Sequence, residues 1–220
     1  MAAPNIGLSG GSQYATISRY NIGMAEFKHC FLLPWILLLP GMAAADTAPL
    51  DACAECHGSD GMGLDNPMVP VIAGMPAGHI EEAIYAYVDG ARSCLREARM
   101  CETVSALSED EVSEVAEYYS QKVRSASRDA FDETLAAEGA DLHAANCAAC
   151  HLPPHDKNVE YAVGIPLHGQ RSEYLRYAIE AYFHGDREAL LDTMASAIRG
   201  LEPGDLGALV HYYASYRPPE

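Results

Sequence analysis

Two short motifs in this 220-residue chain combine residue types that can hold a metal or redox centre. In each motif, two residues separate a pair of cysteines, and a histidine directly follows the second cysteine. This CxxCH pattern is found at zinc sites, in redox-active dithiols and at points of covalent haem attachment. The motifs consist of Cys53, Cys56 and His57, and of Cys147, Cys150 and His151.

The two motifs belong to an internal repeat. The offset between the copies is 94 residues at the motifs and again near the end of each copy, and 95 residues in the stretch between. An offset maintained over this length indicates two copies of one fold in tandem. In chain order, the matched pairs include Gly74 and Gly169, Gly90 and Gly185, Arg92 and Arg187, Met100 and Met194, and Tyr119 and Tyr213.

Covalent haem attachment explains the repeat better than zinc or a redox dithiol. A zinc site needs a second pair of ligands in each copy, and Cys94 and Cys101 of the first copy have no counterpart in the second. A thioredoxin-like dithiol needs a βαβ unit, and the sequence has no such strand pattern. In haem c, two thiols add to the vinyl groups and the adjacent histidine binds the iron. We therefore predict two covalent haem c groups per chain.

Met100 and Met194 are the predicted second iron ligands, opposite His57 and His151. Each methionine lies 43 residues after the histidine of its own motif. A thioether opposite an imidazole is typical of small electron-transfer cytochromes, and it raises the redox potential of the iron. The alternative is that both methionines fill gaps in the core. That alternative does not explain the equal spacing.

The composition is that of a folded and strongly acidic protein. Hydrophobic residues make up 49% of the chain, which is enough for a packed core. The chain has 31 acidic and 14 basic residues and a formal net charge of −17, which argues against binding to nucleic acid. The charge suits a partner with a basic docking patch, or it serves only to keep the protein soluble.

Residues 1–45 are predicted to be a signal peptide with an upstream extension. An apolar run at residues 31–39 follows Lys28 and precedes small residues that end at Ala45. The run is too short to span a bilayer and contains Pro34, which disfavours a retained membrane helix. We therefore expect a periplasmic protein with no membrane span in the mature chain.

The mature chain is predicted to be all-α. Apolar residues recur at helical spacing in residues 78–89 and 171–184, and again after each methionine. Ser108 followed by Glu111 has the pattern of a capping box. A further helix, within residues 131–150, leads into the second motif. We predict a first domain at residues 46–120, a polar linker at 121–130 and a second domain at 131–220.

Together these features resemble the dihaem cytochromes of the cytochrome c4 type. The shared features are the paired CxxCH motifs, a late methionine followed seven residues on by leucine, and a closing helix with paired tyrosines. Residues 130–151, 167–188 and 206–216 are similar to the cytochrome subunit of flavocytochrome c sulfide dehydrogenase. Members of this group carry Gly-Gln after the haem-binding loop. The second copy has Gly169–Gln170, whereas the first copy has Gly74–Met75.

This resemblance implies two class I cytochrome c domains related by a pseudo-twofold axis, each wrapped around one covalent haem. It also implies an electron-transfer subunit of an oxidoreductase that has no catalytic residues of its own. Such a subunit accepts electrons from a FAD flavoprotein that oxidises sulfide, and FAD is bound only by that partner. The electrons then pass to a soluble cytochrome or an oxidase. A free dihaem cytochrome that carries electrons to a terminal oxidase is the alternative.

The resemblance also bears on the matched arginines Arg92 and Arg187, which either pair with haem propionates or are solvated surface residues.

Cys94 and Cys101 are the thiols that remain after the signal and the motifs are set aside, and we expect a disulfide. Seven residues of straight helix would separate their Cα atoms by about 10.5 Å, beyond the limit of about 7 Å for a bridge. The segment must therefore turn, or the two cysteines are buried free thiols.

Overall fold

The computed structural model describes residues 48–95, 98–189 and 191–219, so the predicted signal segment lies outside the described residues. These residues form α-helices and one 3-10 helix, with no β-strand among them. The all-α prediction is therefore confirmed. None of the helices in the described ranges is long and apolar enough to cross a membrane.

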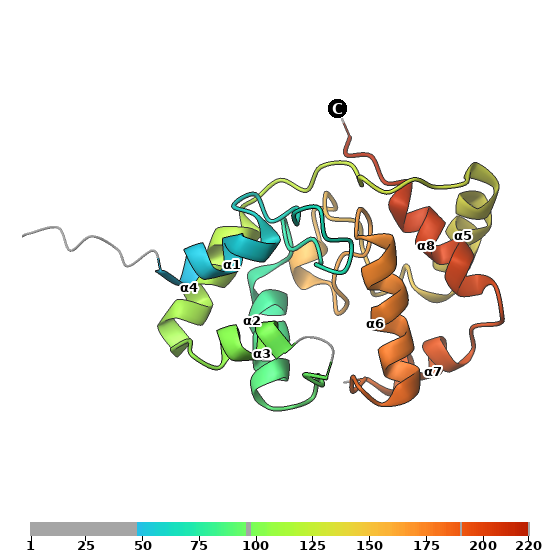
Figure 1. The fold of residues 1–220 in the computed structure, drawn as a ribbon. Helices are drawn as coiled ribbons and strands as arrows, with labels where there is room; N and C mark the ends of the chain where they lie inside the picture. Colours follow the sequence, from blue (N-terminus) through green and yellow to red (C-terminus); the bar gives the residue numbers. More distant parts are fainter. Residues whose placement is uncertain (1–47, 96–97, 190, 220) are drawn as a thin grey trace, which may run out of the picture. The chain divides into compact units, whose positions relative to one another are not determined.

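The helices occur as two sets of four, which match one another in order (Figure 1). The pairs that pack together are also the same in both sets, because α1 and α2 contact α4 as α5 and α6 contact α8. In addition, α3 packs on α2 as α7 packs on α6. The helices are α1 (Ala48–His57), α2 (Ala77–Val88), α3 (Ala98–Val104), α4 (Glu109–Ser120), α5 (Glu133–Asn146), η1 (Val159–Tyr161), α6 (Ser172–His184), α7 (Asp192–Arg199) and α8 (Asp205–Ala214).

Helix α4 shows why these segments are helical. The side chain of Ser108 accepts a hydrogen bond from the Glu111 N–H, and the Glu111 carboxylate accepts one from the Ser108 N–H, which completes the predicted capping box. Farther along the helix, Val112, Val115 and Tyr119 are buried at helical spacing and form its apolar face. The capped start and the apolar face together fix α4 against α2 and α1.

In the second half, α5 and α8 cross closely (Figure 1). A glycine makes this approach possible. A Cβ atom at Gly139 would lie 2.1 Å from the backbone oxygen of Ala208, so no larger residue fits there without moving a helix. This crossing places the end of α5, and with it the second CxxCH motif, beside the buried ring of Tyr213 on α8.

The two halves meet where the repeat brings equivalent residues together. Arg92 and Arg187 form an antiparallel bridge, although they are the same position of the two copies. On either side, the Ser93 N–H donates to the oxygen of Asp186 at 2.7 Å, and the Glu188 N–H donates to the oxygen of Ala91 at 2.9 Å. Each of these hydrogen bonds is the image of the other under the repeat. This local symmetry is that of a pseudo-twofold axis.

The segment between α4 and α5 also joins the halves. Arg124 lies within it and is only 3% exposed. Its guanidinium donates from Nε to the oxygen of Ala73 at 2.9 Å, and from Nη1 to the oxygens of Pro166 at 2.9 Å and His168 at 3.0 Å. The stretch predicted as a polar linker therefore holds the loop before α2 and the loop before α6 through a buried arginine.

Candidate functional site

The first CxxCH motif forms the last five residues of α1. Cys53 and Cys56 are free thiols with half-buried side chains, and His57 is 8% exposed. Burial, with a smaller contribution from Cys56, raises the pKa of the Cys53 thiol. The structure thus brings the three predicted residues of the first site together.

The ring of His57 is oriented so that one nitrogen remains for a metal. Its Nδ1 lies 3.1 Å from the backbone oxygen of Pro70, and a carbonyl oxygen can only accept a hydrogen bond. The proton is therefore on Nδ1, and the lone pair of the neutral ring is on Nε2. Burial also lowers the pKa of His57, which favours the neutral form that metal ligation requires.

The second motif repeats this arrangement in the turn that follows α5. Nδ1 of His151 donates to the backbone oxygen of Ile165 at 2.8 Å, and burial lowers the pKa of this ring as well. Gly164 lies directly against the ring, since a Cβ atom there would be 2.6 Å from Nδ1. Cys147 and Cys150 are free and half-buried, like their counterparts in the first motif.

The two predicted methionine ligands occupy equivalent places. Met100 is the third residue of α3, and Met194 is the third residue of α7. Both side chains are half-buried. By contrast, Met62 and Met75 are buried members of the core clusters of the first half. The equal position in the helix matches the equal spacing in the sequence, and ligation of the iron by Met100 and Met194 stays a prediction.

Cys94 and Cys101 are joined by a disulfide, with Cα atoms 6.0 Å apart. Because α3 begins only at Ala98, the two cysteines do not belong to one continuous helix, and the geometric condition for a bridge is met. The predicted disulfide is confirmed, and the alternative of two free thiols is wrong. The bridge ends on the residue that follows Met100.

The side chains of each site fit haem c. Each half offers two free thiols for covalent attachment, a neutral imidazole with Nε2 available, and a methionine thioether. They fit zinc poorly, because Cys94 and Cys101 are bonded to each other. In the described part of the chain, no three His, Cys, Asp or Glu side chains gather as metal ligands.

Arg92 and Arg187 lie together at the antiparallel bridge, and Arg187 is only 7% exposed. The Cζ of Arg92 lies 5.4 Å from the ring centre of Tyr87, and the Cζ of Arg187 lies 5.6 Å from that of Tyr182. Burial lowers the pKa of Arg92, and the charge of Arg187 adds to the effect. The interpretation as a solvated surface residue is therefore wrong for Arg187. Pairing with haem propionates stays a prediction for both arginines.

A histidine–tyrosine cluster is specific to the second half. Nδ1 of His143 lies 3.0 Å from the hydroxyl of Tyr213, and Nε2 of His168 lies 3.2 Å from the hydroxyl of Tyr212. Both histidines are buried. Burial, with the nearby charges of His143 and Arg124, lowers the pKa of His168 to about 3. The repeat does not reveal this cluster, because Pro49 and Ala73 occupy the equivalent positions in the first copy.

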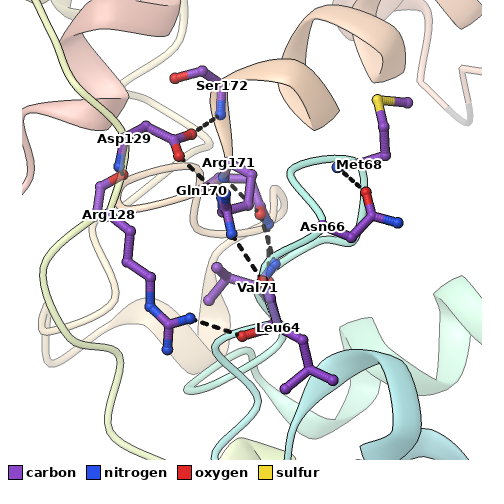
Figure 2. A network of polar contacts seen from close by, with 11 residues as sticks. Leu64, Asn66, Met68, Val71, Arg128, Asp129, Gln170, Arg171 and Ser172 are labelled. Carbon is purple, nitrogen blue, oxygen red and sulfur yellow. Dashed lines mark hydrogen bonds and ion pairs between the residues drawn. The ribbon is translucent and has the colours of Figure 1, made fainter.

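Sequence reasoning also missed a polar network between the halves (Figure 2). Asp129 accepts from Nε of Arg171 at 3.1 Å and from the N–H of Ser172, the first residue of α6. Arg171 also donates from Nη1 to the oxygen of Leu64 at 3.2 Å. Beside it, the side chain of Gln170 reaches the backbone of Val71 in the loop between α1 and α2. A carboxylate at the start of α6 is also favoured by the helix dipole.

No protein-family model matches the chain. Over 177 residues the chain is 30% identical to the thiosulfate dehydrogenase electron acceptor of Stutzerimonas stutzeri (strain A1501). The alignment covers 74% of this chain and 78% of that protein. The structure is similar to reduced recombinant cytochrome c4 from Pseudomonas stutzeri, with a TM-score of 0.65 and 24% identity, over 77% of this chain and 95% of the other.

A second structural neighbour is the thiosulfate dehydrogenase of Marichromatium purpuratum in its as-isolated form, with a TM-score of 0.60 and 25% identity. This similarity covers 76% of this chain and 36% of the other, so the chain spans about a third of that protein. These similarities do not show the finer likeness to the flavocytochrome c sulfide dehydrogenase subunit. The chain has the tandem cytochrome c4-type fold, and it belongs to the electron-transferring dihaem c-type cytochromes that include the thiosulfate dehydrogenase electron acceptors.

Proposed function

We propose that this chain accepts electrons from a thiosulfate dehydrogenase and passes them to a further redox protein. The observation that carries this proposal is the 30% identity, over 177 residues, to a protein named as the electron acceptor of that enzyme. An alignment of that length extends over both halves of the repeat. The thiosulfate dehydrogenase from Marichromatium purpuratum, which shares the fold over part of its length, supports the same partner.

The residues of the two sites perform complementary tasks in this function. Haem c, when bound, supplies a one-electron couple at each site. The paired thiols would hold it covalently, and the Nδ1 hydrogen bonds of His57 and His151 leave Nε2 of each ring available to bind the iron. Met100 and Met194 would each supply a thioether as the second protein ligand of the iron. With two protein ligands on each iron, the haems would transfer electrons and would leave no position on the iron for a substrate.

A sulfide-oxidising FAD flavoprotein is the second candidate for the electron donor. The similarity of residues 130–151 and 167–188 to the cytochrome subunit of flavocytochrome c sulfide dehydrogenase favours it. In that case FAD is bound by the flavoprotein alone. A free cytochrome that serves a terminal oxidase shares the same sites and differs only in its partners.

The chain works outside the cytoplasm in either case. The predicted signal segment at residues 1–45 supports export to the periplasm. The disulfide between Cys94 and Cys101 supports the same compartment, because such bonds persist where the environment is oxidising.

Rapid mixing of the oxidised holoprotein with candidate donors tests the proposal. We expect both haems to be reduced within one turnover of a thiosulfate dehydrogenase from the same organism in the presence of thiosulfate. Thiosulfate alone, or the enzyme alone, should leave them oxidised. Reduction only by a flavoprotein with sulfide would instead identify the second candidate.

A further inference from the structure

One peptide group in the first half, between Pro70 and Val71, is hydrogen-bonded on both of its sides. Its carbonyl oxygen accepts from Nδ1 of His57 at 3.1 Å. Its N–H donates to Oε1 of Gln170 at 2.6 Å. Gln170 also donates from Nε2 to the oxygen of Val71 at 2.9 Å (Figure 2). The glutamine belongs to the other half of the molecule, and only 1% of its surface is exposed.

The glutamine side chain is itself fixed in place. Its Oε1 accepts a second hydrogen bond, from the N–H of Arg171 at 3.0 Å. Arg171 in turn pairs with Asp129 and donates to the oxygen of Leu64 in the same loop of the first half. Gln170 is therefore held on its own side, and the loop is held next to it.

Hydrogen bonds on the two sides of one peptide group strengthen each other. An N–H that donates to Oε1 polarises the amide and makes its carbonyl oxygen a better acceptor. A better acceptor opposite Nδ1 makes the imidazole of His57 a stronger electron donor at Nε2. Stronger donation stabilises the ferric iron and lowers its potential.

The second half cannot make this arrangement. The carbonyl that accepts from His151 belongs to the peptide group between Ile165 and Pro166, and proline has no N–H to donate. The repeat matches Val71 with Pro166. It also matches Gln170 with Met75, whose thioether is only a weak acceptor and has no N–H to donate. Met75 is instead buried in a core cluster against which Ile165 packs. An apolar pair thus replaces the polar pair, which gives a physical reason for Met75 in place of the family's glutamine.

We propose that Gln170 is a positioning residue for the haem of the first site, although it lies in the second half of the chain. Through the Pro70–Val71 peptide group it fixes and polarises the carbonyl that accepts the hydrogen bond from Nδ1 of His57, and so lowers the potential of that haem alone. The inference rests on the haem ligation proposed above. Methionine ligation is detected by a weak near-infrared sulfur-to-iron band of the oxidised protein. The proposed ligation and the proposed role of Gln170 can therefore fail separately.

The test is Gln170→Met in the holoprotein, which inserts the residue of the first copy at the matched position and keeps the buried volume. Spectroelectrochemistry gives the two potentials, and NMR signals of the methionine methyl groups assign them to the two haems. We expect the potential of the first haem to rise. In the half-reduced protein, the equilibrium ratio of electrons on the first haem to electrons on the second should then increase by about threefold, where a tenfold change corresponds to about 59 mV for one electron. The potential of the second haem should stay unchanged.

Two further variants separate tuning from packing. Val71→Pro removes the N–H, leaves Gln170 in place, and copies the backbone of Ile165–Pro166. It should give the same shift, and the double variant no more than either single variant. Met75→Gln is the matched control and should leave the second haem unchanged, because Pro166 offers no N–H. The inference would be overturned if the difference between the two potentials is unchanged in Gln170→Met while the near-infrared sulfur-to-iron bands of both methionines are retained. Wild-type protein without those bands would overturn the ligation itself.

Discussion

At the scale of single residues, Met100 and Met194 differ from the core methionines in burial and agree with each other in helix position. We predict that Met194→Ala in the oxidised holoprotein removes half of the weak near-infrared band from sulfur to iron. It should also lower one of the two potentials, since a thioether favours ferrous iron. Met68→Ala, at an exposed methionine, is the control. An intact band in Met194→Ala would mean that another side chain binds the second iron.

A second residue-scale prediction concerns His168. Its pKa is about 3 in the native state, against an ordinary value of 6.5. Between these values the unfolded chain binds a proton that the native protein does not. The free energy of unfolding should therefore fall as the pH decreases from about 6.5 toward 3. Denaturant titrations across this range measure the slope. His168→Gln should flatten it, whereas substitution of the exposed His184 should leave it as it was.

At the scale of elements, α3 is a short helix that carries a methionine ligand and depends on three neighbours. It packs on α2, Arg99 pairs with Glu55 of α1, and Cys101 is bonded to Cys94. The ion pair is exposed on both sides and contributes little. Of these two links, the disulfide is therefore the stronger restraint on the Met100 segment. The sequence has no cysteines beside α7 that could form an equivalent bridge.

We predict that Cys94→Ser/Cys101→Ser lowers the free energy of unfolding by about 2 kcal/mol, because the closed loop is small. On heating, the half of the near-infrared band that belongs to Met100 should be lost at a lower temperature than in the wild type. The half that belongs to Met194 should be lost at an unchanged temperature. Equal loss of both halves would show that the bridge stabilises the whole molecule and not the ligand segment.

At the scale of the whole molecule, the charge of −17 bears on the encounter with the partner. If the acidic surface attracts a basic docking patch, the association rate with the electron donor should fall as salt rises, because screening shortens to several ångströms. Stopped-flow measurements from low to high ionic strength test this with either donor. A rate that is independent of salt would assign the acidity to solubility alone.

The sequence predicted the parts of this structure that repeat or follow a period. The helices expected at residues 78–89 and 171–184 are found at Ala77–Val88 and Ser172–His184, since helical spacing of apolar residues is a local signal. The contacts of Gln170 and Arg124 could not be predicted in this way. Their partners lie up to 99 residues away, are backbone atoms, and leave no pattern in the side chains. Met75 in place of a glutamine is likewise explained only by the other half, where Ile165 packs against its cluster and Pro166 has no N–H.

The bridge at Arg92 and Arg187 is an isologous contact, in which one surface meets its own copy. Two separate proteins would need a large area to hold such a contact, but here the segment after α4 tethers the halves. A short tether gives an effective concentration in the millimolar range, so these backbone hydrogen bonds and the contacts of Gln170 and Arg171 suffice without a large apolar interface. Cutting the tether would turn a permanent pairing into one that depends on dilution. The fraction of molecules in which the two sites lie close enough to exchange an electron would then depend on protein concentration.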